Sequence, residues 1–161
     1  MLGQSVIVVR GRLARRVREE AEKLGVSVDE YLVELLSQGL DPRDKAVEYI
    51  EAAEELLEEA RKELEKGNVR QAAEKLWGAS ALAVKAYAYW REGKRLSSHG
   101  ELWNYMRLMT REMGSWVREA WMYANGMHTC FYEGWCARED VEDSIKHVEE
   151  LVKEVASRIK K

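Results

Sequence analysis

Apolar side chains recur every three or four residues through most of the chain after residue 40, and this spacing predicts a series of amphipathic helices. The first is expected at about 43–66, where an apolar stripe is surrounded almost entirely by Glu, Lys and Arg. Gly67-Asn68 is a typical helix-ending turn, so a second helix is expected at about 69–92. Much of the second helix is apolar on every side, which predicts the buried central helix of a bundle.

Three further helices are expected toward the C-terminus. Ser98 and Glu101 form a capping box, in which each side chain satisfies a free backbone N–H group at a helix start. The last helix has apolar residues at alternating steps of four and three, a seam for packing on its neighbours. The three helices are expected at about 98–113, 115–133 and 137–160. About five helices joined by short turns predict an all-α, up-and-down bundle.

Residues 1–40 follow a different pattern. Four consecutive β-branched or apolar residues favour a short strand at 5–10. Helical spacing begins at Arg12 and ends at Gly25, and a second short helix follows a capping box that begins at Ser27. The second helix is expected to bury three leucines, which are Leu32, Leu35 and Leu36.

Asp41 and Pro42 can cap and open a helix, so they mark a boundary between two units, 1–40 and 41–161. A lone strand is not stable, and the rest of the chain is expected to be helical. The strand is therefore expected to pair with its own copy in an antiparallel ribbon, which makes the protein a homodimer.

The order strand, helix, turn, helix resembles the ribbon-helix-helix module, whose paired strands enter the major groove of DNA. The phase of the strand directs Ile7 and Val9 inward, which leaves Val6 and Val8 on the outer face. Valines offer no hydrogen-bond donors to base edges. We therefore expect a dimerisation module, with DNA binding as the alternative. DNA binding would use the basic side chains of Arg10, Arg12 and Arg16.

The composition excludes several classes of protein. The chain has 161 residues, of which 46% are hydrophobic and 34% charged, with two cysteines and a net charge of −3. The apolar content is too high for a disordered tail and the cysteines are too few for a disulfide scaffold. No apolar run reaches the ~18 residues of a membrane span, and no signal peptide is apparent, so we expect a cytoplasmic protein without membrane contact. The scarcity of Asn and Gln beside so many charged residues is typical of thermostable proteins.

Three segments, 75–87, 98–103 and 127–134, together resemble the archaeal PaREP repeat family, and the resemblance covers roughly 41–161. That family is in turn similar to the HEPN helical bundles, which form dimers and bind nucleotides or nucleic acid. Many HEPN proteins are metal-independent ribonucleases, whereas PaREP proteins generally lack an assigned activity. The resemblance implies a helical bundle, a dimer and a role connected with RNA.

In the HEPN nuclease motif four to six residues stand between an Arg and the His that follows it, and His128 is the candidate for that histidine. The positions where the arginine would stand hold Trp121, Met122 and Tyr123, and the nearest upstream arginine is Arg118. Without that cation the charge that builds up on a phosphate in the transition state is not stabilised. Ribonuclease activity is therefore the alternative, and a non-enzymatic protein is expected. His128 is then a partly buried helix residue hydrogen-bonded to a neighbour.

His128 and Tyr132 lie four residues apart on one helix face, beside Glu133. With Lys85, they are the candidates for a ligand-binding site, whose ligand would be a nucleotide, RNA, DNA or a protein partner. The same residues equally suit a polar network that fixes helix packing. His99 follows Arg95 at a helix start, which suits an anion site or an ordinary surface loop.

No metal or other cofactor is expected. His128 and Cys130 stand two residues apart on a helix, so their side chains point in nearly opposite directions. Cys130 and Cys136 are expected to be free thiols, or one disulfide if the source is hyperthermophilic. Twelve of the fourteen aromatic residues lie between Trp77 and Trp135, and most should be core, with two or three left to stack on a base.

Overall fold

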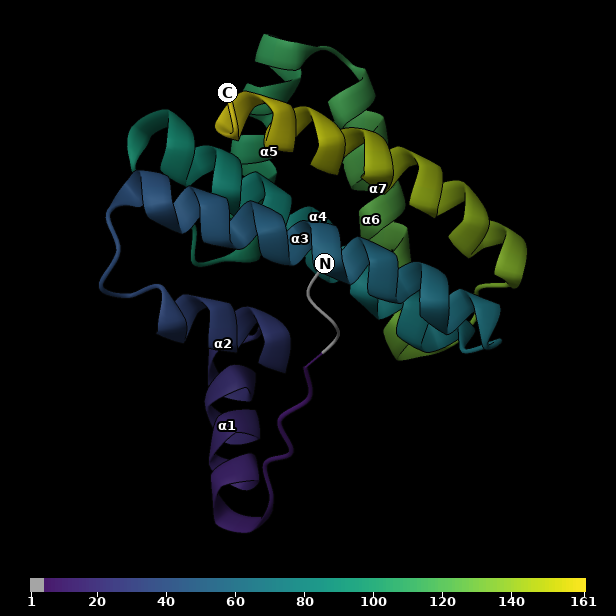
Figure 1. Ribbon diagram of the computed structural model, residues 1–161. Coiled ribbons are helices and arrows are strands. Elements are labelled where there is room, and N and C mark those ends of the chain that lie inside the picture. Colours follow the sequence, from purple (N-terminus) through teal and green to yellow (C-terminus); the bar gives the residue numbers. More distant parts are fainter. Residues whose placement is uncertain (1–4) are drawn as a thin grey trace.

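A computed structural model describes residues 5–161 and contains seven helices, with no strand in that range. Two short helices, α1 (Gly11–Leu24) and α2 (Val28–Leu36), precede five longer ones. The five are α3 (Pro42–Glu65), α4 (Val69–Glu92), α5 (His99–Met113), α6 (Trp116–Glu133) and α7 (Arg138–Ile159). Figure 1 shows α3, α4 and α7 running side by side, with α5 and α6 behind them and α1 projecting away from the bundle.

The helix ends follow local chemistry. The side chain of Asp41 accepts a hydrogen bond from the backbone N–H of Asp44 at 3.0 Å, and Pro42 occupies the first turn of α3. Gly93 ends α4 with a φ of +66°, a conformation in which glycine has no steric penalty. The five helices after residue 40 begin and end close to the expected positions, so the predicted helical bundle is confirmed.

Helix α4 is the centre of the bundle, in contact with α3, α5, α6 and α7. Most of its residues are buried, including Leu76, Leu82 and Tyr87. Gly78 allows α3 to approach closely, because a Cβ at that position would lie 3.1 Å from Cδ1 of Leu56. The buried residues of the hydrophobic core all lie between Ala46 and Ile159. The bundle therefore has a complete core of its own.

The expected strand at 5–10 is wrong for the described chain: these residues are not in a sheet. Ile7, expected to face inward, is 88% exposed, and Val9 is also exposed. The three leucines expected to be buried by α2 are exposed as well, and Leu36 is 82% exposed. The physical reason is that residues 5–40 have no sheet edge to pair with and little apolar surface to cover them within one chain.

The aromatic residues lie mostly in the core, as expected, with Trp121 and Tyr87 fully buried. Tyr132 and Trp135 are exceptions that remain exposed at the end of α6 and in the turn that follows. None of the helices in the described range is long and apolar enough to cross a lipid bilayer.

Candidate binding site between helix α4 and the N-terminal helices

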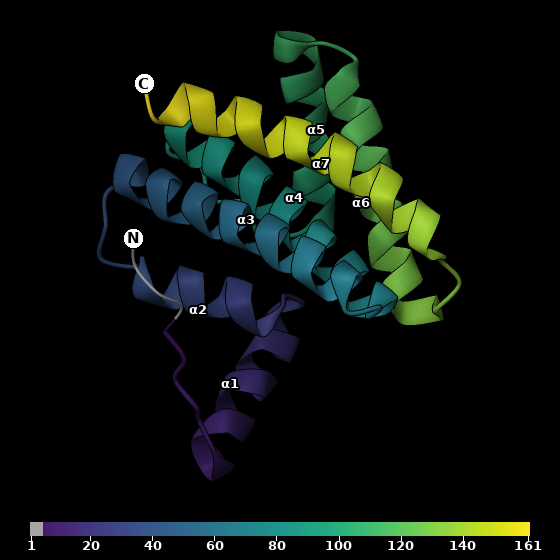
Figure 2. The same ribbon diagram turned by 45° about the vertical axis from the view of Figure 1, so that its right-hand side comes forward.

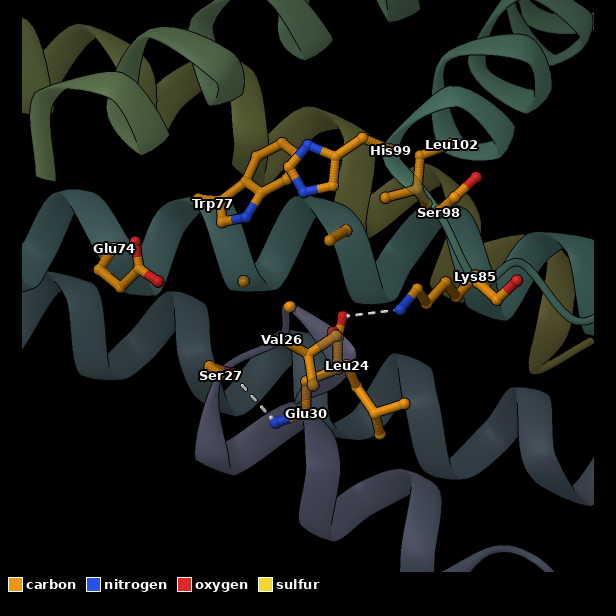
Figure 3. A pocket seen from close by; sticks show the side chains of 14 residues that line it. Leu24, Val26, Ser27, Glu30, Glu74, Trp77, Lys85, Ser98, His99 and Leu102 are labelled. Atoms are coloured by element: carbon orange, nitrogen blue, oxygen red, sulfur yellow. Dashed lines mark hydrogen bonds and ion pairs between the residues drawn. The ribbon is translucent and has the colours of Figure 1, made fainter. Parts of the chain in front are cut away.

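A small cavity of about 40 Å³ lies between α4, the start of α5 and the turn that joins α1 to α2. Figure 3 shows Glu74, Trp77 and Lys85 reaching it from α4, with His99 above and Glu30 below. Glu74, Trp77, Ala81 and Lys85 are spaced by three, four and four residues, so they share one face of α4. The turn from Leu24 to Ser27 forms the opposite wall.

Trp77 is the centre of a cluster of rings that come from three helices. Its indole stacks on the imidazole of His128, with centroids 4.5 Å apart and planes at 25°. The ring of His99 lies 5.5 Å from that of Trp77 and 5.4 Å from that of His128. Burial lowers the pKa of His99, and the electrostatic influence of the nearby His128 and Lys85 acts in the same direction. The cluster therefore favours a neutral His99 ring, and the residue is exposed at the start of α5.

His128 also faces a carboxylate. Its Nδ1 lies 3.7 Å from Oε2 of Glu74, which is within ion-pair range but beyond a hydrogen bond. Both atoms are buried, and neither has a hydrogen-bond partner among the described residues. The expectation that His128 is hydrogen-bonded to a neighbour is therefore wrong for this geometry, whereas its partial burial is confirmed. Two unsatisfied polar atoms leave donor and acceptor capacity beside the ring cluster.

Lys85 and Glu30 form a buried ion pair at the other end of the cavity. Nζ of Lys85 lies 3.2 Å from Oε1 of Glu30, and their side chains are 9% and 7% exposed. Burial raises the pKa of Glu30, although the adjacent Lys85 opposes that change. Ser27 holds the start of α2 in place, because its hydroxyl accepts a hydrogen bond from the backbone N–H of Glu30 at 3.1 Å.

The predicted ligand-binding residues do not all meet in one place. Lys85 lines the cavity, and His128 lies behind Trp77 in the ring cluster. Tyr132 contacts His128 edge-on, with centroids 5.1 Å apart, but is 69% exposed. Glu133 is exposed at the end of α6 and does not line the cavity. The site therefore includes two of the four predicted residues, with a third at its margin.

Sequence reasoning did not connect Glu30 and Glu74 with the site, and it gave Trp77 only as one of several aromatic residues that could stack on a base. The shared face of Glu74, Trp77 and Lys85 on α4 was a signal that could have identified two of them. Glu30 offered no such signal, because its ion pair depends on how α2 packs against the bundle.

The predicted nucleic-acid-binding residues Arg10, Arg12 and Arg16 are exposed near the start of α1. Figure 2 shows that this end of α1 points away from the bundle. Arg16 pairs with Glu20 on the next turn, with 3.7 Å between Nη2 and Oε1. The arginines are therefore separate from the cavity, which adjoins the opposite end of α1.

Cys130 and Cys136 form a disulfide, with Cα atoms 5.5 Å apart, which decides between the two states left open by the sequence. The bond ties the last turn of α6, close to His128, to the turn that precedes α7. Within residues 5–161, no group of three or more His, Cys, Asp or Glu side chains is arranged to hold a metal ion.

The fold and the cavity define an all-helical bundle with a ring cluster beside a buried ion pair. The model of the Archaeal PaREP1/PaREP8 family matches residues 48–152, about two-thirds of the chain, and the chain belongs to that family. No curated protein and no solved structure matches it. The resemblances to HEPN bundles and to ribbon-helix-helix modules stay predictions. The matched region contains Trp77, Lys85, His99 and His128, whereas Glu30 lies outside it.

Proposed function

We propose that this protein is a non-enzymatic homodimer that binds a nucleotide or single-stranded nucleic acid at the cluster of Trp77, His99 and His128. The observation that carries the proposal is this ring cluster, in which three rings lie within 5.5 Å of one another beside the cation of Lys85. Proteins that bind unpaired nucleotides combine flat side chains, which stack on bases, with cations that contact the phosphates.

Binding is favoured over cleavage by what surrounds His128. The face of its imidazole is covered by Trp77, its edge meets Tyr132, and Glu74 is its nearest charged neighbour. A general acid or base must lie within hydrogen-bond reach of the reacting proton. A ring enclosed in this way is suited to stacking rather than to proton transfer with a phosphodiester.

Homodimer formation is supported by the apolar surface of residues 5–40. Ile7, Leu13, Leu32 and Leu36 are all exposed in a single chain. Several exposed large apolar side chains in one short segment are typical of a surface that is buried in an assembly. Pairing with a second copy would cover them. In such a dimer, contact with DNA through Arg10, Arg12 and Arg16 stays a prediction.

Titrations with fluorescent U10 RNA, duplex DNA and ATP at about 0.15 M salt test the binding function. We expect saturable binding of the RNA or the nucleotide, weakened about fivefold by His99→Ala, because loss of one stacking contact costs about 1 kcal/mol or more. His147→Ala is the matched control, since His147 stacks on Tyr123 away from the cavity. Absence of saturable binding to any probe would leave only a protein partner as the ligand.

Metal-independent ribonuclease activity is the second candidate, and one observation favours it. His99 and His128 lie 5.4 Å apart beside Lys85, and a pair of imidazoles can act as general acid and general base. This candidate predicts RNA cleavage in the presence of a chelator and its loss in both His99→Ala and His128→Ala. RNA that stays intact after long incubation at high protein concentration would eliminate it.

A further inference from the structure

Helix α2 carries three acidic residues and no basic residue, and all three acids pair with cations of the bundle. Asp29 lies 3.5 Å from Nζ of Lys75, and Glu30 lies 3.2 Å from Nζ of Lys85. Glu34 accepts a hydrogen bond from Nε of Arg95 at 3.0 Å. Every carboxylate of this helix is therefore directed to the bundle rather than to solvent alone.

The three cations lie on the side of the bundle that faces α2, where Lys85 lines the cavity and Lys75 also pairs with Glu59 of α3. Lys75 and Lys85 belong to α4 and flank Trp77 in the sequence, and Arg95 follows α4 in the turn that leads to His99. We call Lys75, Lys85 and Arg95 the cationic strip. Cations beside stacking rings are the features that bind the phosphates and bases of an unpaired polynucleotide. Helix α2 presents negative charges to the positions where phosphates would bind.

The apolar contact between α2 and the bundle is limited. Val33 packs partly buried against the core, but Leu32, Leu35 and Leu36 are exposed. Charge pairs are therefore a major part of the contact between α2 and the bundle. Burial of Glu30 and Lys85 carries a desolvation cost that offsets much of their mutual attraction. Since no residue of α2 is among the buried residues of the core, α2 can leave while the bundle stays folded.

The size of the cavity gives an independent reason for movement. Its volume of about 40 Å³ has room for only a few water molecules. Pockets for small ligands have volumes of roughly 300–1,000 Å³. Because the turn from Leu24 to Ser27 forms one wall, displacement of α1 and α2 is the direct way to open the site to a nucleotide.

We infer that α2 is an acidic latch that occupies the cationic strip and competes with the phosphates of a single-stranded polynucleotide. The inference rests on the proposed binding function and adds its regulation. The strip lies within residues 48–152, which match the family model, whereas the latch lies outside them. The protein thus alternates between a closed form, with α2 on the strip, and an open form that binds the polynucleotide.

The test compares the full-length protein with the variant Asp29→Asn/Glu30→Gln/Glu34→Gln. The matched control is Glu48→Gln/Glu51→Gln/Glu55→Gln, which removes the same charge from exposed positions of α3. Amide hydrogen exchange of α2 reports opening, and fluorescent U10 RNA and T10 DNA report binding. We call the variant that lacks the three carboxylates of α2 the latch variant. In this variant only, we expect faster hydrogen exchange in α2 and an affinity for the probes that is higher by about tenfold or more, because the open form becomes the major one.

Addition of Lys85→Met to the latch variant locates the binding site. Once α2 has left, Lys85 is accessible to a phosphate, so its loss should remove most of the gain in affinity. A gain that survives Lys85→Met, or one that the control variant reproduces, would contradict the inference, because general charge would then explain it.

The two proposals can fail separately. If wild type and latch variant bind U10 equally well, or if exchange in α2 does not change, the latch is wrong and the binding function stands. If exchange in α2 rises but no form of the protein binds U10 or T10, the binding function is wrong and the latch falls with it. A preference between U10 and T10 decides whether the ligand is RNA or DNA.

Discussion

The bundle of residues 42–159 buries most of its large apolar side chains, whereas the N-terminal segment of residues 5–40 leaves most of them exposed. In the bundle, residues such as Leu82 and Trp121 are fully buried and belong to one continuous core. In the N-terminal segment, Ile7 and Leu36 are largely exposed. Among residues 5–40, Ala21 is the one buried hydrophobic residue. The bundle has a buried core of its own, whereas the N-terminal segment leaves most of its apolar side chains exposed.

The two regions also differ in how charge is used. Several ion pairs of the bundle connect partly exposed residues of one helix, such as Arg158 and Glu154 of α7, and such pairs stabilise little. The acids of α2 instead reach across to Lys75, Lys85 and Arg95. Charge therefore joins the two regions, while apolar contact holds only the larger one together.

The largest expected effect is a loss of stability when one leucine of the bundle is truncated, compared with one leucine of the N-terminal segment. Leu82→Ala should lower the free energy of unfolding by about 2–5 kcal/mol, because it leaves a cavity in the centre of α4. Leu36→Ala should change it by no more than about 0.5 kcal/mol in dilute protein, because the side chain is already exposed. Urea unfolding of both variants measures the difference. If the two variants lose similar amounts of unfolding free energy at low protein concentration, the two regions do not differ in burial as described.

A charged substitution on the exposed leucine sharpens the comparison by testing assembly. The wild-type protein should have twice the mass of the 18.7 kDa chain in solution. Leu36→Asp should reduce it to one copy, because a carboxylate buried in the interface would be desolvated without a partner. Light scattering measures both masses. Met122→Asp is the control, since Met122 is also an exposed apolar residue but belongs to the bundle. A wild-type mass of one copy at tens of micromolar would contradict the dimer.

The contrast between the regions also explains which features the sequence could predict. Helix ends in the bundle depend on nearby residues, such as Ser98, whose hydroxyl accepts a hydrogen bond from the N–H of Glu101. Lys85 could be singled out because a cation interrupts an otherwise apolar helix face. The strand at 5–10 could not be decided in the same way, because β-branched residues form a strand only when another strand is available. That availability depends on the assembly rather than on the segment.

The rest of the site was beyond local reasoning for a related reason. His99 and His128 are 29 positions apart, and only the packing of α5 and α6 on α4 brings both rings to Trp77. The HEPN motif requires an arginine close to the histidine in the sequence. The cation nearest the cavity is instead Lys85, which the fold supplies from another helix.

The smallest expected effect is a pH dependence that arises from His99. Its pKa is lowered in the folded protein, mainly by burial, from the value of about 6.5 that it has in an unfolded chain. Below that value the unfolded chain binds a proton more readily than the folded one does, so stability should fall as the pH is lowered through about 6.5 and level off below the folded pKa. His99→Gln should reduce this loss between pH 7 and pH 5. His147→Gln on α7 is the control and should leave the loss as it is in the wild type. Unfolding midpoints measured across this pH range test the prediction, and equal slopes for His99→Gln and wild type would show that the ring cluster does not disfavour a charged His99.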